Sequence, residues 1–212
     1  MDRQLAHLAK TVSHPAIRLA AIGDADRDEP TVVQRLLFET RQASLHADAE
    51  SAAGDIPLRL NSTDFKIVIL PGVEGAEQSS VATPIDAAIC VVDCTEDPRG
   101  QIDKLSSKLL RYGIRQIVVA VNNMDRVAYD AGQFRRIETE IVACLKDRAL
   151  KPEAVIPVSV RDGVGITEHT YTFEWFRPTL VEALTQLTPR ALVSETRGSN
   201  KLSANHAEGI AA

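Results

Sequence analysis

Polar residues suited to a nucleotide site follow several apolar runs of the chain. Asn122-Asn123-Met124-Asp125 follows one run, and Ser159-Val160-Arg161 follows the next. Amide, carboxylate and hydroxyl groups can read the hydrogen-bonding edge of a base. A third segment begins at Gly23, where a phosphate-binding loop would read G-x-x-x-x-G-K-[ST]. A nucleotide site therefore requires a fold that brings these segments to one edge.

Short apolar runs alternate with longer amphipathic segments, the pattern of β-α-β units around a parallel sheet. The runs predict strands at Ile17–Ile22, Phe65–Leu70, Ala87–Asp93, Ile117–Asn122 and Val155–Ser159, with a weaker one at Ile56–Asn61. Periodicity predicts helices at Pro30–Arg41, Gln101–Tyr112, Gln133–Arg148 and Pro178–Leu187. We therefore predict an α/β fold: a P-loop-NTPase-like, doubly wound, mostly parallel sheet with helices on both faces.

The chain divides into one domain and two terminal segments. The domain spans 16–190, and an N-terminal extension at 1–15 precedes it, with helical character at Asp2–Val12. Residues 191–212 lack periodicity and are expected to be a disordered tail. Arg41–Asp55 is polar and predicts a long flexible loop within the domain.

Four motif positions resemble, in order, those of the G domain of translation-factor-type GTPases. They are the phosphate loop from Gly23, the second switch at Pro71-Gly72-Val73, the guanine motif at Asn122–Asp125 and the last motif at Ser159. Within that class the chain is most similar to the large, GTP-hydrolysing subunit of heterodimeric ATP sulfurylase, including its form in the nodulation bifunctional enzyme. That similarity is carried by Arg35–Phe38, Tyr112–Arg115, Val119–Val127 and Trp175–Leu180.

The phosphate half of this resemblance is degenerate. Asp28, Glu29 and Pro30 occupy the Gly, Lys and Ser/Thr positions of the loop, ahead of Thr31. In the family the lysine reaches the β and γ phosphates, so Glu29 replaces attraction by repulsion. One unit-charge pair at roughly 4 Å is worth about 4 kcal/mol near a protein surface. These residues suit the start of a helix instead, with Asp28 as its cap and Pro30 in its first turn.

The second switch departs from the family too. Ile69 stands where the resemblance implies a magnesium-positioning Asp, and Val73 where it implies a water-orienting His. GTP hydrolysis by the family mechanism is therefore not expected, and no catalytic residue is assigned. No Cys or His group has metal-ligand spacing, so no metal site is predicted.

The base-binding half retains more of the family pattern. The resemblance implies that Asp125 accepts from the N1 and N2 hydrogens of guanine, while Asn122 bonds the neighbouring loop. Asn123 replaces a lysine whose aliphatic stem packs on the base. The alternative is that Asn122 and Asp125 only stabilise a strand-to-helix turn. The first interpretation allows a weakly held guanine nucleotide, and the second expects no cofactor.

Charge and hydropathy exclude two classes of partner. The chain carries 24 basic against 29 acidic residues, a net charge of −5, which argues against nucleic acid and anionic membranes. No stretch approaches the roughly 20 apolar residues that span a bilayer, and the N-terminus lacks a secretion signal. We expect a cytoplasmic protein.

These observations favour a pseudo-GTPase, a catalytically degenerate GTPase-like domain acting as a regulatory or protein-interaction factor and not as an enzyme. The resemblance implies sulfate activation or sulfur metabolism as the context, with a sulfate-activation subunit as a partner. One alternative is a divergent guanine-nucleotide-binding GTPase, whose activity would be GTP hydrolysis. Another is a decayed paralogue that keeps the fold without a role.

Overall fold

The computed structural model describes residues 15–23, 31–42, 55–70 and 84–190. Within these ranges six strands form one sheet in the order β2-β3-β1-β4-β5-β6. Neighbouring strands are parallel except for the antiparallel pair β2–β3. The predicted mostly parallel α/β sheet is therefore confirmed. The strands span Ile17–Ile22 (β1), Ile56–Leu60 (β2), Thr63–Ile69 (β3), Ala87–Asp93 (β4), Gln116–Asn122 (β5) and Ala154–Pro157 (β6).

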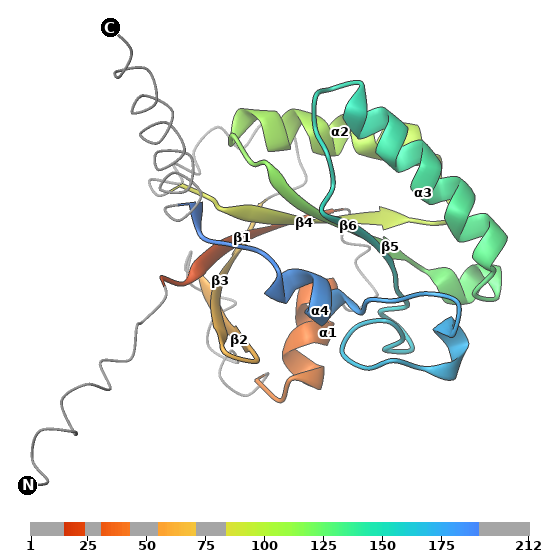
Figure 1. The fold of residues 1–212 in the computed structure, drawn as a ribbon, viewed down its shortest axis with the longest axis horizontal. Helices are drawn as coiled ribbons and strands as arrows, with labels where there is room; N and C mark the ends of the chain where they lie inside the picture. Colours follow the sequence, from red (N-terminus) through yellow and green to blue (C-terminus); the bar gives the residue numbers. More distant parts are fainter. Residues whose placement is uncertain (1–14, 24–30, 43–54, 71–83, 191–212) are drawn as a thin grey trace, which may run out of the picture.

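Helices cover both faces of this sheet, as Figure 1 shows. Helices α2 and α3 lie on one face, and α1 and α4 lie on the other. Each pair closes its own apolar core against the strands between them. The helices span Val32–Glu39 (α1), Pro98–Arg111 (α2), Ala131–Lys146 (α3) and Leu180–Thr185 (α4), with 3-10 turns at Met124–Val127 and Tyr171–Phe173.

The inner strand β5 is buried on both of its sides. Ile117, Val119 and Val121 belong to the core shared with α2 and α3. Val118 and Ala120 belong to the core shared with α1 and α4. None of the five exposes any surface. Burial on both faces is why this strand, like β4, is a continuous apolar run in the sequence.

All four helices start at residues other than those predicted, because their capping side chains lie elsewhere. Helix α2 begins at Pro98, ahead of its predicted start, since the Asp97 carboxylate accepts from two backbone N–H groups of the first turn. Helix α4 begins at Leu180, after Pro178, because Thr179 is the N-cap of a reciprocal capping box. The prediction that Pro178 opens this helix is wrong.

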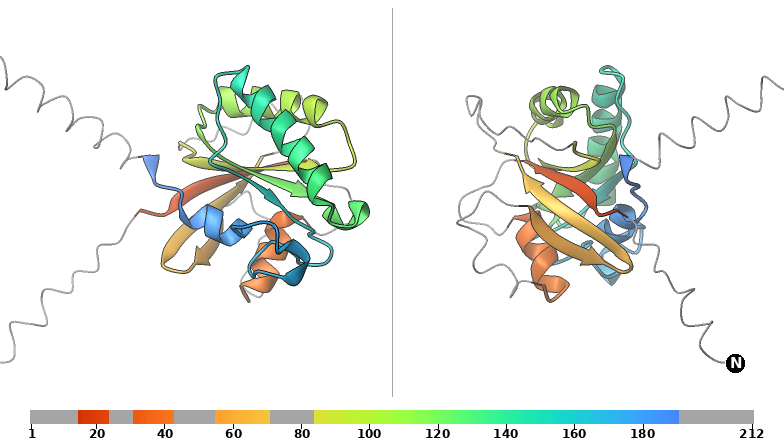
Figure 2. Two further views of the ribbon diagram at one scale, coloured as in Figure 1. Left: turned by 45° about the vertical axis from the view of Figure 1, so that its right-hand side comes forward. Right: turned by 90° about the vertical axis from the view of Figure 1, so that its left-hand side faces the viewer.

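On the outer edge of strand β2, the backbone groups of Arg59 already have hydrogen-bond partners. Figure 2 (right) shows the β2–β3 hairpin at this side of the sheet. The Gln42 side chain donates from Nε2 to the carbonyl oxygen of Arg59 and accepts from the Arg59 N–H, both at 2.8 Å. Pro57, the preceding residue on the same edge, has no N–H to offer. The strand ends at Leu60, because Asn61 adopts a positive φ of 52° in the hairpin turn.

Several predictions fall on residues that the structure does not describe. They include the tail at 191–212, the helical segment Asp2–Val12 with nearly all of the extension at 1–15, and most of the loop Arg41–Asp55. No helix in the described ranges is both long enough and apolar enough to cross a membrane.

Replacing Gln42 tests whether its side chain protects the outer edge of β2. Gln42→Ala removes two hydrogen bonds and exposes the Arg59 backbone, so the free energy of unfolding falls by about 1–2 kcal/mol and the protein self-associates at high concentration. Urea titration and light scattering measure the two effects. The matched control Gln42→Glu keeps an acceptor for the Arg59 N–H and is expected to lose about half as much. Wild-type stability in Gln42→Ala would contradict the role of this side chain.

Candidate functional site

The carboxyl ends of the parallel strands bring the predicted base-binding residues together. Asn122 is the last residue of β5 and pairs in register with Asp93, the last residue of β4. Asp125 follows in the 3-10 turn Met124–Val127. Ser159 comes after β6, which ends at Pro157 and not at Ser159 as predicted. Ser159 instead forms an isolated bridge with Val164, which closes a tight loop at the same edge.

A hydrogen bond between Ser159 and Asp125 joins the two base motifs. The Ser159 Oγ donates to Oδ1 of Asp125 at 2.7 Å and accepts from the Asp162 N–H at 3.2 Å. Ser159 has no exposed surface. The other carboxylate oxygen, Oδ2, lies 3.7 Å from Nη1 of Arg161, whose side chain is 69% exposed. Asp125 is therefore fixed through one oxygen, while an exposed cation holds the other loosely.

Asn122 faces the same loop. Its Oδ1 accepts a hydrogen bond from the backbone N–H of Val160 at 3.0 Å. Its Nδ2 makes no hydrogen bond within the part of the chain that the structure describes. Asn122 thus ties the end of β5 to the loop after β6, and one amide donor is left over. Together with Oδ2 of Asp125, this edge therefore carries an amide donor and an anionic acceptor.

The Asn123 side chain turns toward the end of β4. The residue adopts a left-handed conformation with a φ of 65°, and it is 6% exposed. Its Nδ2 donates to Oδ2 of Asp93 at 2.7 Å, and its carbonyl accepts from the Cys94 thiol at 3.0 Å. Asn123 therefore anchors the turn to β4 and offers no stem to pack on a base. The sequence analysis missed Asp93, although its place at the end of an apolar strand marks it as a residue of the carboxyl edge.

On the phosphate side, the structure describes Gly23 and Thr31 but not the Asp28, Glu29 and Pro30 that lie between them. A Cβ at Gly23 would lie 2.7 Å from the Cβ of Val91, so glycine is required where β1 ends against β4. The second-switch residues Pro71, Gly72 and Val73 also lie outside the described residues, and Ile69 ends β3 with 62% exposure. The described residues contain no group of three His, Cys, Asp or Glu that could hold a metal ion.

Helix α1 begins later than predicted. It starts at Val32, with Thr31 as its N-cap, so the prediction of Asp28 as cap and Pro30 in the first turn is wrong. The Thr31 hydroxyl accepts from the Gln34 N–H at 3.2 Å, and the Gln34 side chain accepts from the Thr31 N–H at 2.8 Å. This capping box uses backbone donors that an open helix N-terminus would present to an anion.

Tyr129 holds the loop between Ser159 and Val164 through a hydrogen bond. Its hydroxyl donates to Oδ2 of Asp162 at 2.5 Å, and its ring meets Phe173 edge-on with centroids 5.5 Å apart. Burial, together with the hydrogen bond to Asp162, raises the pKa of Tyr129 to about 12. Tyr129 thus acts as a neutral donor that holds the loop residue next to Arg161.

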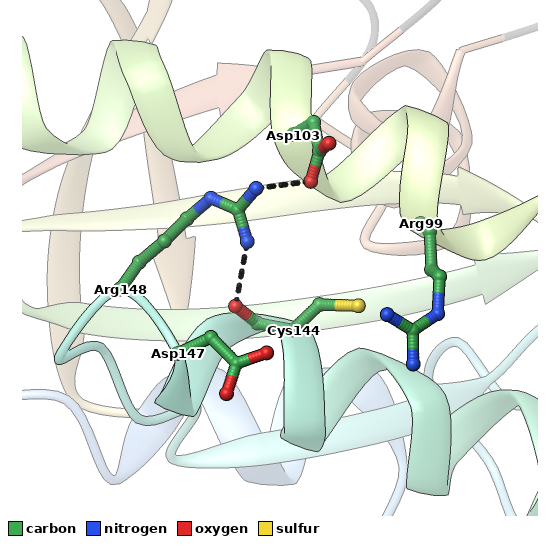
Figure 3. Close-up of a pocket in the computed structure, with 5 residues that line it drawn as sticks. All are labelled: Arg99, Asp103, Cys144, Asp147 and Arg148. Carbon is green, nitrogen blue, oxygen red and sulfur yellow. Dashed lines mark hydrogen bonds and ion pairs between the residues drawn. The ribbon is translucent and has the colours of Figure 1, made fainter.

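A separate hollow of about 420 Å³ lies between α2 and α3 (Figure 3). Arg148 pairs with Asp103 and donates from Nη1 to the carbonyl oxygen of Cys144 at 2.9 Å. Arg99 and Asp147 complete the lining. Two guanidinium groups and two carboxylates balance there, so the hollow offers no net charge to a ligand. The carboxyl edge of the sheet is the stronger candidate site.

A mostly parallel sheet of this strand order, with helices on both faces and with Asn122, Asp125 and Ser159 at the carboxyl ends of its strands, has the fold of a G domain of the P-loop NTPase class. The chain belongs to the elongation factor Tu GTP binding domain family, whose model matches residues 61–190.

Curated relatives and solved structures agree with this family. The chain is 30% identical to elongation factor 1-alpha of Methanothermobacter thermautotrophicus over 209 residues, covering 85% of this chain and 49% of the relative. It is 28% identical to elongation factor 1-alpha of Methanopyrus kandleri over 211 residues, covering 86% of this chain and 49% of the relative. The chain thus spans about half the length of the curated relatives it matches.

Two solved structures share the fold. The structure of sup35 complexed with GDP aligns with a TM-score of 0.58 at 18% identity, covering 87% of this chain and 47% of that one. A bacterial selenocysteine-specific elongation factor, EF-Sec, aligns with a TM-score of 0.51 at 22% identity, covering 70% and 26%.

Replacing Tyr129 tests its support of the loop. Because the folded-state pKa lies near 12 and the ordinary value near 10, its contribution to stability is full below pH about 10 and is lost as pH rises toward 12. Tyr129→Phe should lower the free energy of unfolding by about 1 kcal/mol at neutral pH and remove part of the decline above pH 10. Tyrosinate absorbance and urea titrations measure both effects, with the 92% exposed Tyr171 as the Tyr171→Phe control. An unchanged alkaline decline would contradict this role.

Proposed function

We propose that this G domain recognises a guanine base weakly at Asn122, Asp125 and Ser159 and does not hydrolyse GTP, so that it acts as a regulatory or protein-interaction domain. The observation that carries the proposal is the state of Asp125. Ser159 fixes Oδ1, whereas the partner of Oδ2 among the described residues is an exposed guanidinium at 3.7 Å. A carboxylate oriented in this way can exchange that partner for two adjacent N–H donors of a ligand at little cost.

Guanine presents the matching donors. Its N1–H and exocyclic amine form an adjacent donor pair, which one carboxylate oxygen can accept. Adenine and cytosine present an acceptor beside their amine, so the same carboxylate would meet a lone pair. The free Nδ2 of Asn122 offers a donor to an acceptor on the ligand. Membership of the elongation factor Tu GTP binding domain family supports guanine over other bases.

The phosphate side argues against a triphosphate. Asp24, Asp26, Asp28 and Glu29 crowd the sequence where the family binds phosphates. A like-charge pair near a protein surface costs about 4 kcal/mol at roughly 4 Å. The capping box at Thr31 uses donors of α1 that an anion would need. The Mg²⁺ that GTP hydrolysis requires also lacks its family ligands at Pro30 and Ile69. We therefore assign no hydrolytic step to this chain.

We further propose that the domain acts through a protein partner in sulfate activation. The support is the similarity of Arg35–Phe38, Tyr112–Arg115 and Val119–Val127 to the large ATP sulfurylase subunit, which works beside a smaller catalytic subunit. Co-purification with that smaller subunit, encoded in the same genome, tests the assignment. Separate elution of the two chains at micromolar concentration would contradict it.

A nucleotide series tests the loss of phosphate binding. Calorimetry with guanosine, GMP, GDP and GTP, with and without Mg²⁺, should show affinity that falls as phosphates are added and does not respond to Mg²⁺. Each added phosphate brings further charge toward the acidic loop, so a fall of about tenfold is expected between GMP and GTP. Micromolar GTP binding that depends on Mg²⁺ would overturn the proposal and establish the divergent GTPase instead.

Asp125→Asn tests base recognition. The Ser159 hydroxyl donates to the oxygen of the new amide, which leaves Nδ2 at the place of Oδ2. This Nδ2 donor would face the C2 amine of guanine, which is also a donor. In xanthine the C2 position carries a carbonyl oxygen, which can accept from Nδ2. Guanosine affinity should drop at least tenfold, and xanthosine affinity should rise by a similar factor. The control Asp162→Asn alters the loop carboxylate that bonds Tyr129 and should keep guanosine ahead of xanthosine. An unchanged preference in Asp125→Asn would show that this carboxylate does not read the base.

A further inference from the structure

Helix α1 is bonded directly to the loop that carries Ser159. Arg35 donates from Nε to Oε1 of Glu39 at 2.7 Å, one turn along the helix. The Thr167 hydroxyl donates to Oε2 of the same carboxylate at 2.6 Å. The Arg35 Nη1 also reaches the carbonyl oxygen of Arg161 at 3.5 Å. Figure 2 (left) shows α1 beside the segment after β6. We call Arg35, Glu39 and Thr167 the α1 clamp.

The clamp is partly shielded from solvent and closely packed. The Arg35 and Glu39 side chains are 23% and 14% exposed, so their ion pair is stronger than a fully solvated one. Gly163 lies directly on the pair. It has a φ of 75°, and a Cβ there would collide with the Arg35 guanidinium and the Glu39 carboxylate. The loop backbone thus rests on the clamp without an intervening side chain.

The other end of this loop holds the base site. The Gly163 and Val164 N–H groups both donate to the carbonyl oxygen of Ser159, at 2.8 and 3.1 Å. Ser159 in turn bonds Asp125, and the next residue, Val160, bonds Asn122. A continuous set of contacts therefore runs from Glu39 through the loop to the carboxylate that reads the base.

We propose that the α1 clamp positions the base-recognition loop, so that Arg35, Glu39 and Thr167 set the affinity for guanine without touching it. This inference rests on the base recognition proposed above. The clamp acts as a positioning device: it holds residues 159–167 on α1, and the loop then holds Asp125 with its second oxygen toward the ligand. Loss of the clamp removes the polar contacts of the loop with α1, while Val160 and Ile166 stay in the core that α1 shares with the sheet.

Three variants remove the clamp to different degrees. Glu39→Ala removes the contacts of this carboxylate with Arg35 and Thr167, and Glu39→Gln keeps a carbonyl acceptor for Thr167. Thr167→Val removes one hydroxyl at nearly constant volume. The matched control is Thr139→Val, whose hydroxyl bonds only its own helix α3 at 2.7 Å from the Arg135 carbonyl oxygen. Hydrogen exchange of the Val160 and Asp162 amides in the ligand-free protein reports whether the loop is held. Guanosine titration by calorimetry reports the base site.

Glu39→Ala should raise the exchange of both amides and weaken guanosine binding at least tenfold, with Glu39→Gln intermediate and Thr139→Val unchanged. Combining Glu39→Ala with Thr167→Val should add nothing, because one carboxylate serves both contacts. Unchanged exchange in Glu39→Ala would overturn the clamp. Faster exchange with unchanged guanosine affinity would overturn its positioning role. Wild-type protein that binds no guanosine would overturn base recognition and this role with it, and the exchange data would then show separately whether the loop is held.

Discussion

The burial of strands β4 and β5 under helices on both faces decides where polar chemistry can lie in this protein. Their inner residues expose no surface, so an unpaired polar side chain there would cost about 1–3 kcal/mol. Polar side chains enter at the last register pair, Asp93 with Asn122, where the strands leave the sheet. Every base-site group described above lies at or beyond that pair. The candidate site lies at the strand ends because the buried middle of β4 and β5 cannot hold unpaired polar groups.

At that edge the polar groups bond mainly to one another. Asn123 bonds Asp93, Asn122 bonds the Val160 backbone, and Ser159 bonds Asp125. These contacts close the turns at the strand ends without help from a ligand. A chain can therefore lose the lysine and the hydroxyl of its phosphate loop and still keep the fold, because the base half is stabilised by protein–protein hydrogen bonds. Among the described residues, the same bonds leave Oδ2 of Asp125 and Nδ2 of Asn122 without a hydrogen bond, and these are the two groups to which we assign base recognition.

Features that depend on the local residue pattern, such as the bounds of strands, could be predicted from the sequence. Strands β1 and β4 match the prediction residue for residue, and the continuous apolar run of β4 is typical of a strand covered on both faces. Helix starts were predicted less well, since several residues near each start can cap, and only the packed structure selects Thr31 for α1. The α1 clamp could not be predicted. Thr167 and Glu39 are 128 positions apart, and nothing in either local sequence indicates that the loop after β6 lies on α1.

The relative cost of binding a base or a phosphate depends on the contacts that each ligand would have to displace or oppose. A base that approaches Asp125 displaces an exposed guanidinium, whose ion pair contributes at most about 1 kcal/mol, and the bond from buried Ser159 stays intact. A phosphate that approaches the start of α1 meets a capping box already formed. The sequence before this cap carries Asp24, Asp26, Asp28 and Glu29, and one like-charge pair at roughly 4 Å would oppose a phosphate by about 4 kcal/mol. Displacing the guanidinium costs little free energy, whereas bringing a phosphate close to acidic side chains would cost several times more. Under the function proposed above, departures in the phosphate loop would therefore weaken phosphate binding before they weaken recognition of a base.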